Sequence, residues 1–299
     1  MDQPALTLEQ PPPTAAEALA ANGYDVTTNG PNGLTYHPGL TNEQYHQLPA
    51  NSPSRLKLLA RSAAHYFDAY LAPDREIKPP TPAMEVGTAL HTAVLEPDLW
   101  DSTVAVAPQQ FDRRTKIGRQ LAEEFEAENA GKLVLTPDDA DRVRRMADAV
   151  HRHPAARTLL DIKGRREASY TWTDPATGLP CKCRPDWHGM DGLLVVDLKT
   201  TRDGSRAEFV RSIAGFDYHL QAAWNLRALG AAQFLSIAVE NVRPYAVAVY
   251  PASPAMIAAG ERRFTAALEL LAECHRTNRW PGYGDLIQEP IDLPGWCRD

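Results

Sequence analysis

The sequence predicts a mixed α/β (α+β) fold, in which a central mixed β-sheet is flanked by helices. Three observations support this class. Apolar residues recur at helical spacing between residues 54 and 152, and the pattern changes to strand-like alternation between 167 and 199. A further helix, two strands and a long helix then follow. Helices placed before a strand meander and again after it are typical of a sheet that helices cover.

The first half of the chain is expected to be helical. From Ser54 to Leu71 apolar residues follow helical spacing after a Ser-Pro-Ser start that suits a helix cap. Residues 84–95 predict a second helix, which ends near Glu96-Pro97. Two polar, amphipathic helices are expected at 115–129 and 137–152, the later one started by the cap signal Thr136-Pro137-Asp138.

The second half is expected to supply the sheet. Residues 167–173, 179–187 and 193–199 predict three strands, with Asp174-Pro175 and Thr177-Gly178 forming the first turn. A helix at 217–229, strands at 234–239 and 245–250, and a helix at 253–276 complete the predicted set. No internal repeat is present.

Composition is that of an ordinary globular protein: 43% of the 299 residues are hydrophobic and 23% are charged. The net charge of −7 argues against a surface that attracts polyanions everywhere, although a local basic groove remains open. No run approaches the roughly 18 apolar residues of a membrane span, and the start does not resemble a signal peptide. The four cysteines do not form a disulfide framework, so we expect a cytoplasmic protein with reduced thiols.

Two regions differ in charge. Residues 1–50 contain five acids and no Lys or Arg, so subtracting −5 from −7 leaves −2 for residues 51–299. The first stretch is rich in Pro, Asn and Gly and is expected to be a loosely packed acidic arm that no strong helix or strand pattern organises. Residues 51–299 are expected to form the functional domain.

The chemistry is expected between residues 181 and 201. Because side chains alternate along a strand, one face of the 179–187 strand carries Lys182, Arg184 and Asp186, with Cys181 and Cys183 opposite. On the next strand Val195, Asp197 and Lys199 share a face, and Leu194, Val196 and Leu198 point to the core. Two neighbouring strands therefore each present a charged face.

The turn between these strands predicts their register. Asp191-Gly192 is typical of a two-residue hairpin turn, which places Asp186 opposite Asp197. Two carboxylates at that distance repel each other unless a cation lies between them, and a divalent metal suits oxygen ligands. A longer loop would shift the register by two residues and keep the same faces. A structural ion pair of these acids with Arg184 and Lys199 is the competing interpretation.

Several motifs together resemble a known family. Pro185-Asp186 followed by Asp197-Leu198-Lys199 resembles the signature of the PD-(D/E)xK nucleases, which have a restriction-endonuclease-like core. The segment Gly87-Thr88-Ala89-Leu90-His91 and the segment from Tyr218 to Ala223 resemble the helical and glutamine motifs of the RecB-like branch. With Trp280-Pro281-Gly282-Tyr283 and Leu293-Pro294-Gly295-Trp296, residues 40–299 resemble most closely the RecE-type exonucleases (exonuclease VIII) of phages and prophages.

The resemblance implies a metal-dependent exodeoxyribonuclease that degrades linear double-stranded DNA from the 5′ end and leaves 3′ single-stranded tails for strand annealing. It implies Mg²⁺ or Mn²⁺, two ions per site, bound by His91, Asp186, Asp197 and the Leu198 carbonyl. Lys199 would orient or activate the attacking water, and Gln221 and Tyr218 would support the site. Asn225 is a departure, because related nucleases often have tyrosine there. The implied partners are a RecT-like single-strand annealing protein and further copies of the chain in a ring; no membrane is implied.

Arginine suits DNA phosphates because its planar fork binds two oxygens at once. The expected DNA contacts are Arg184, Arg113, Arg114, Lys116, Arg119 and Arg202. Gly87, one turn before His91, is expected to permit the close approach of another element. Whether Glu85, Glu96 or Glu167 joins the site stays open at this point.

Two other functional interpretations compete. A DNA-binding recombination accessory protein could keep the fold without cutting, although Asp186, Asp197 and Lys199 occur together here. An iron–sulfur nuclease would use four cysteines, one before the core and three clustered after it. Cys181 and Cys183 instead lie within the strand meander, which favours small core residues.

Overall fold

A five-stranded sheet forms the centre of the computed structural model, which describes residues 33–76, 79–108, 111–284 and 289–292. Strand β8 is parallel to β9, and the other neighbours are antiparallel, so the sheet is mixed as predicted. Its strands, in spatial order, are β10 (Val247–Pro251), β9 (Gln233–Glu240), β8 (Leu194–Thr201), β7 (Trp187–Gly189) and β4 (Gly164–Arg166).

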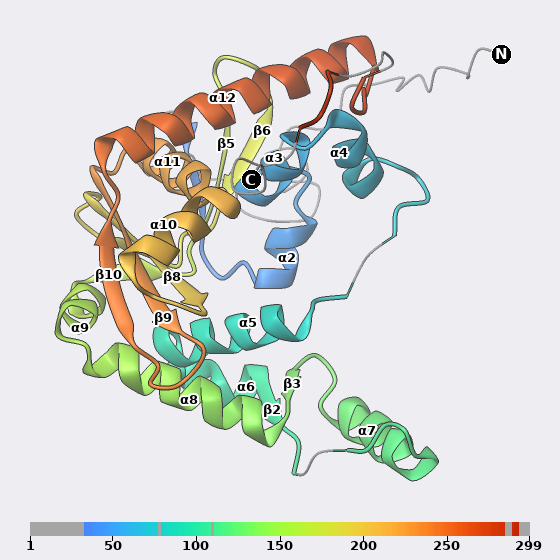
Figure 1. The fold of residues 1–299 in the computed structure, drawn as a ribbon, viewed down its shortest axis with the longest axis vertical. Helices are drawn as coiled ribbons and strands as arrows, with labels where there is room; N and C mark the ends of the chain where they lie inside the picture. Colours follow the sequence, from blue (N-terminus) through green and yellow to red (C-terminus); the bar gives the residue numbers. More distant parts are fainter. Residues whose placement is uncertain (1–32, 77–78, 109–110, 285–288, 293–299) are drawn as a thin grey trace.

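Helices cover both faces of this sheet (Figure 1). Val196 and Leu198 of β8 pack with α5 (Pro82–Leu95), α8 (Pro137–Arg152) and α9 (Pro154–Asp161). Val195, on the other face, packs with α11 (Tyr218–Leu229), which in turn contacts α12 (Pro254–Thr277). Burial on both faces explains why β8 is apolar at Leu194, Val195, Val196 and Leu198 around Asp197.

A second, antiparallel sheet lies on the α12 side. It consists of β1 (Thr35–His37), β5 (Ser169–Thr173) and β6 (Pro180–Cys183), and its core includes Cys181, Cys183, Trp224 and Phe264. Three short helices adjoin it: α2 (Asn42–Gln47), α3 (Pro53–Leu59) and α4 (Ala63–Tyr70). Helix α10 (Arg206–Gly215) follows β8 in the chain and contacts α11.

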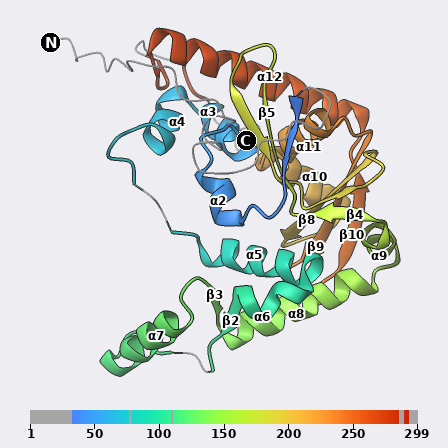
Figure 2. The same cartoon turned by 180° about the vertical axis from the view of Figure 1, so that it is seen from behind.

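A third unit extends from the opposite side of the molecule. Strands β2 (Val104–Val106) and β3 (Leu133–Leu135) are parallel and follow η2 (Pro97–Leu99) and α6 (Trp100–Thr103). Between them α7 (Lys116–Glu128) projects away from the rest of the chain in both views (Figures 1 and 2). Only Gly118 and Ala122 of α7 are buried.

Two predicted elements are each divided in the structure. The 54–71 helix breaks into α3 and α4, because Ser62 starts a new helix by accepting a hydrogen bond from the His65 amide. The 179–187 strand breaks into β6 and β7, which belong to different sheets. The prediction that Lys182 shares the face of Asp186 is therefore wrong: Lys182 Nζ donates instead to the carbonyls of Tyr45 (2.7 Å) and Leu48 (2.9 Å).

The expected loose arm is partly ordered. Residues 33–50 include β1 and α2 and bury Leu34, Leu40 and Tyr45, so the expectation that no strand or helix organises this stretch is wrong there. Residues 1–32 lie outside the described residues. The boundary at residue 50 stays a prediction.

Cys181, Cys183 and Cys274 are free and buried in the core; Cys297 lies outside the described residues. Within the described ranges, no helix has the length and apolarity needed to cross a bilayer.

Candidate active site

Helix α5 brings His91 to the edge of β8. Thr81 caps the helix, Pro82 occupies its first turn, and Ala89 and Leu90 are fully buried, which fixes the orientation of the next residue. His91 Nε2 lies 3.1 Å from the Leu198 carbonyl oxygen, and Nδ1 lies 3.2 Å from Glu167 Oε1. Because both oxygens only accept hydrogen bonds, this geometry suits a doubly protonated imidazolium.

Glu167 lies where β4 leads into β5, and its backbone has a positive φ of 46°. This conformation is uncommon for a residue other than glycine and persists only where surrounding contacts hold it. Here the Glu167 amide donates to the Asp186 carbonyl (3.0 Å), and Arg184 Nε donates to Glu167 Oε2 (3.0 Å). The strained backbone therefore directs the Glu167 carboxylate at His91.

Asp186 precedes β7 and faces β8. Trp187 pairs with Val196 and His188 with Val195, so continuing the same register places Asp186 opposite Asp197, as the turn predicted. Asp186 Oδ2 accepts a 2.6 Å hydrogen bond from the Leu198 amide, and Oδ1 lies 3.6 Å from His91 Nδ1. The side chain is almost buried, so its remaining lone pairs face the site rather than bulk solvent.

His91, Glu167 and Asp186 form a group that can hold a metal ion. Their ligand atoms all lie within 4.8 Å of one another. One imidazole and two carboxylates are a donor set that divalent cations such as Mn²⁺ accept, with the carboxylates also suiting Mg²⁺. The protonated ring of His91 now lies against the carboxylates of Glu167 and Asp186. A bound cation would contact the same two carboxylates in place of that proton. The residues present therefore fit a divalent metal.

Asp197, Lys199, Gln221 and Tyr218 form a second cluster next to this group. Both Lys199 Nζ and Gln221 Nε2 donate to Asp197 Oδ1, at 2.7 and 2.8 Å, and Asp197 is buried. The Tyr218 ring centroid lies 5.2 Å from Lys199 Nζ, a cation–π contact. The four residues that the glutamine and lysine motifs singled out thus lie together. Asp197 is not part of the group formed by His91, Glu167 and Asp186.

Charge coupling changes the protonation of these groups. Burial alone would lower the pKa of His91, but the carboxylates of Asp186 and Glu167 outweigh it and raise the pKa to about 9. Burial, with the negative charge of Asp197 adding to it, raises the pKa of Asp186 to about 7. For Lys199, burial is outweighed by Asp197 and Asp186, so its pKa lies above the usual value and the amine stays charged. Burial therefore outweighs the charges of His91 and Lys199 at Asp186, and a cation bound to this carboxylate would favour its ionised form.

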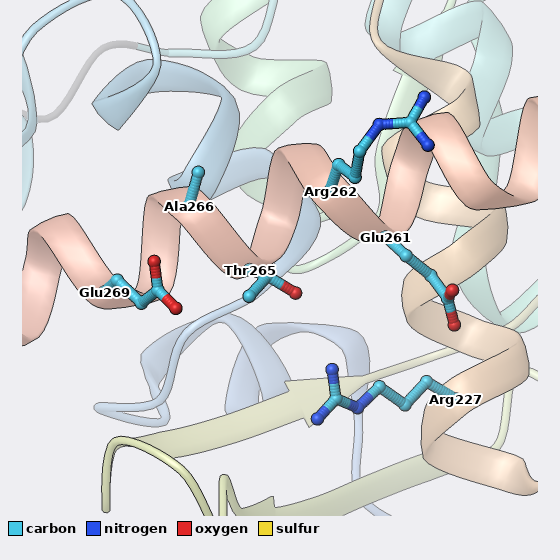
Figure 3. Close-up of a pocket in the computed structure, with 6 residues that line it drawn as sticks. All are labelled: Arg227, Glu261, Arg262, Thr265, Ala266 and Glu269. Carbon is cyan, nitrogen blue, oxygen red and sulfur yellow. The ribbon is translucent and has the colours of Figure 1, made fainter.

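Two cavities adjoin the site. The larger cavity, about 750 Å³, is lined by His91, Thr88, Glu96, Leu133, Glu167 and Arg184 among others. The smaller cavity, about 180 Å³, is lined by Lys57, Ser52, Asn225, Gln221, Glu167 and Arg184 among others. The Glu167–Arg184 ion pair borders both. A third hollow lies on the surface between α11 and α12, with Arg227, Glu261, Arg262 and Glu269 around it (Figure 3), and shares no residue with the site.

The predicted DNA contacts fall in different places. Arg184 borders both cavities, but its guanidinium already donates to Glu167, Ser169 and the Leu40 carbonyl. Arg202 is exposed in the loop after β8. The predicted clamp residues Arg113, Arg114, Lys116 and Arg119 are exposed at the start of the projecting helix α7, where Arg113 pairs with Glu126 and Arg114 with Asp112.

Two expectations about neighbouring residues change. A Cβ added to Gly87 would meet no atom within 4 Å, so the predicted close approach of another element is wrong; Gly87 instead lines the larger cavity. Glu167 joins the site, Glu96 only lines the larger cavity, and Glu85 lines neither cavity. Sequence reasoning missed Lys57 altogether. The position of Lys57 on its helix did not indicate a role in the site, because its contact with Tyr218 joins residues that lie far apart in the chain.

A family model matches most of the chain. The model of a family described as a PDDEXK-like domain of unknown function (DUF3799) matches residues 52–289, which is most of the chain. The chain belongs to this family. The range that matches the PDDEXK-like family contains His91, Glu167 and Asp186 as well as the Asp197–Lys199 pair.

One solved structure is similar to this chain in its fold. A crystal structure described as a candidate exonuclease from Eubacterium rectale has a TM-score of 0.50 and 15% identity, covering 85% of this chain and 96% of its own. A phage-related exonuclease from Haemophilus somnus 129PT has a TM-score of 0.33 and 12% identity, covering 77% and 96%. Only the first similarity has a TM-score high enough to bear on the argument, and at 15% identity it concerns the fold alone. Among curated proteins there is no significant match.

Proposed function

We propose that this PDDEXK-like protein is a metal-dependent exodeoxyribonuclease that degrades linear double-stranded DNA. The observation that carries the proposal is the convergence of His91, Glu167 and Asp186 beside the Asp197–Lys199 pair, where His91 and Glu167 line a cavity of about 750 Å³. An ion pair with a purely structural role would not require three potential metal ligands to lie together next to a large cavity. Perturbed carboxylates in such a place are typical of catalytic sites.

The chemistry divides among the residues of the site. A bound Mg²⁺ or Mn²⁺ ion supplies a water of lowered pKa and neutralises negative charge on the phosphate. Asp186, Glu167 and His91 would hold the ion, and we further propose that Asp197 and the Leu198 carbonyl complete the ligand set for two ions. Lys199 is held charged by Asp197, so it orients the attacking water or a phosphate oxygen by donating hydrogen bonds.

Gln221 and Tyr218 position the lysine and its acid. The Gln221 amide donates to Asp197 Oδ1, and the Tyr218 ring faces the Lys199 ammonium. Neither group needs to transfer a proton for this role. Each restricts the conformations of the Asp197–Lys199 pair, so that the charge of Lys199 stays at one point in the site.

The finer substrate assignment rests on the resemblance to RecE-type exonucleases. We propose 5′ to 3′ digestion that leaves 3′ single-stranded tails. The residues proposed to contact DNA are Arg184, Arg202 and the basic residues just before and in the first turn of α7, namely Arg113, Arg114, Lys116 and Arg119. We also propose a homo-oligomeric ring that acts with a RecT-like single-strand annealing protein in the cytoplasm. The exposed basic residues of α7 are positioned to reach DNA outside the cavity, because that helix projects from the body (Figure 2).

The test is a digestion time course on linear duplex DNA labelled at either the 5′ or the 3′ end, with Mn²⁺, with Mg²⁺ and with a chelator. The expected result is metal-dependent loss of the 5′ label as mononucleotides while the 3′-labelled strand persists. A covalently closed circle of the same sequence is the control and should stay intact. Binding of the duplex without any cleavage would instead support the alternative, an inactive recombination accessory protein.

A further inference from the structure

Lys57 places a second lysine next to the proposed catalytic one. It lies on α3, which packs against α11, and its Nζ is 5.4 Å from the centroid of the Tyr218 ring. Lys199 Nζ lies 5.2 Å from the centroid of the same ring. One aromatic side chain therefore contacts two ammonium groups that come from different parts of the sequence.

Lys57 has no acid of its own. Among the ion pairs of the described residues none includes Lys57, whereas Lys199 is paired with Asp197. The side chain is half-buried, and burial together with the charge of Lys199 lowers its pKa to about 8, against the weaker opposing effect of Asp197 and Asp217. Holding a partly desolvated cation beside another cation costs free energy, and a bound anion would offset that cost.

The smaller cavity gives such an anion a place. Besides Lys57 its wall carries the amide of Asn225 and the hydroxyl of Ser52, together with Arg184 and the Gln221 amide, which already donate to Glu167 and Asp197. Glu167 is its one acid among the described residues, and that carboxylate already accepts from Arg184 and lies against His91. The wall is thus rich in donors and poor in free negative charge, which suits phosphate oxygens.

The two cavities are arranged for neighbouring phosphates. They share four lining residues, Asn42, His46, Glu167 and Arg184, and two residues of the metal group, His91 and Glu167, line the larger one. Lys57 and Gln221 face the smaller one, and Gln221 also contacts Asp197. A DNA strand that presents one phosphate to the metal group therefore has the smaller cavity directly beside that phosphate.

We propose that Lys57 binds a non-bridging oxygen of the DNA phosphate adjacent to the scissile one, in the smaller cavity. The inference rests on the proposed nuclease function. Lys57 is then a substrate-binding residue, distinct from Lys199, which acts at the scissile phosphate. Its contact contributes through charge, so arginine should replace lysine with little loss and methionine should not.

The test combines substitution with neutral linkages in the DNA. Native protein, Lys57→Met and Lys57→Arg digest duplexes in which one methylphosphonate replaces a single phosphate at successive positions next to the cleaved bond. Lys57→Met should lower kcat/KM on normal DNA by about tenfold, the effect of losing one charged hydrogen bond. In native protein a neutral linkage at one adjacent position should cause a similar loss, and Lys57→Met should show no further loss there. Lys163→Met, an exposed lysine that lines neither cavity, is the matched control and should behave as native.

A second measurement does not depend on cleavage. In Ca²⁺, the slope of log Kd against log salt concentration for duplex binding should fall in magnitude by about 0.9 for Lys57→Met, because one phosphate contact is lost. Equal salt slopes, or a loss in Lys57→Met that adds fully to the methylphosphonate loss at every position, would overturn the inference. If native protein binds DNA but never cuts it, the nuclease proposal fails while the salt slope still decides the role of Lys57.

Discussion

Glu167 Oε1 lies 3.2 Å from His91 Nδ1, although 76 positions of sequence separate the two residues. The contact joins the middle of α5 to the strained backbone between β4 and β5. Glu167 is further held by Arg184 and by its own amide hydrogen bond to Asp186. Its carboxylate is therefore built into the metal group rather than resting on the surface.

Replacing Glu167 by glutamine should weaken metal binding. The substitution keeps the shape but removes one of two carboxylates near His91, and loss of a ligand or of its close support typically costs 10–100-fold in metal affinity. Isothermal titration of the metal-free protein with Mn²⁺ measures the change. Glu96→Gln is the matched control, because Glu96 lines the larger cavity outside the metal group and should leave the affinity unchanged. Equal Mn²⁺ affinities in the two variants would exclude Glu167 as a ligand.

Asp197→Asn and Lys199→Met should each abolish cleavage of linear duplex DNA while leaving the protein folded. Asp197 fixes the Lys199 ammonium through a 2.7 Å hydrogen bond, so either change removes a charge from the position that the reaction needs. A loss of at least about 10³-fold is expected for such an electrostatic group. Cleavage rates on labelled duplex measure it, and circular dichroism checks the fold. Retained activity in either variant would refute the site.

Gln221→Met should lower kcat with little change in KM. Methionine fills a similar volume but cannot donate to Asp197 Oδ1, so the Asp197–Lys199 pair gains freedom. The lost bond to a charged group corresponds to about tenfold in rate. Steady-state kinetics on linear duplex DNA separate the two constants. A rise in KM at constant kcat would show that Gln221 binds substrate rather than positions the pair.

The sequence predicted the parts of the site that lie within one hairpin. The turn expected at Asp191-Gly192 predicted the register that places Asp186 opposite Asp197, and this register is confirmed, although the hydrogen-bonded turn runs from Gly189 to Gly192. These steps depend on local chemistry, so they are visible in a single sequence. The face of β8 that carries Asp197 and Lys199 follows from the same alternation.

The remaining parts depend on contacts between distant elements. Glu167 reaches the site because β4, which precedes it, pairs with β7 of the hairpin, and Lys57 reaches it because α3 packs against α11. Neither residue lies in a recognisable pattern. Lys182 shows the reverse: alternation placed it with Asp186, but Pro185, which lacks an N–H, lies where the chain passes from one sheet to the other. Local periodicity cannot indicate that change of sheet.

Lys182 should make the stability of the protein depend on pH. Its buried Nζ donates to backbone carbonyls at the end of α2, and burial, with the nearby charge of Arg55 adding to it, lowers its pKa from 10.5 to about 7. Between these two values the unfolded chain binds a proton that the folded chain does not. The contribution of Lys182 to the free energy of unfolding is therefore fully present above pH 10.5 and is lost as the pH falls towards 7.

The expected slope of this contribution is up to about 1.4 kcal/mol per pH unit, the value for one proton. Urea denaturation of native protein and of Lys182→Met across this pH range measures it, because the difference between the two curves removes the titration of all other groups. The stability of native protein should rise relative to that of Lys182→Met as the pH increases, whereas Lys163→Met, which removes an exposed lysine, should follow native protein. Parallel curves for native protein and Lys182→Met would mean that the carbonyls of Tyr45 and Leu48 keep Lys182 charged in the folded state.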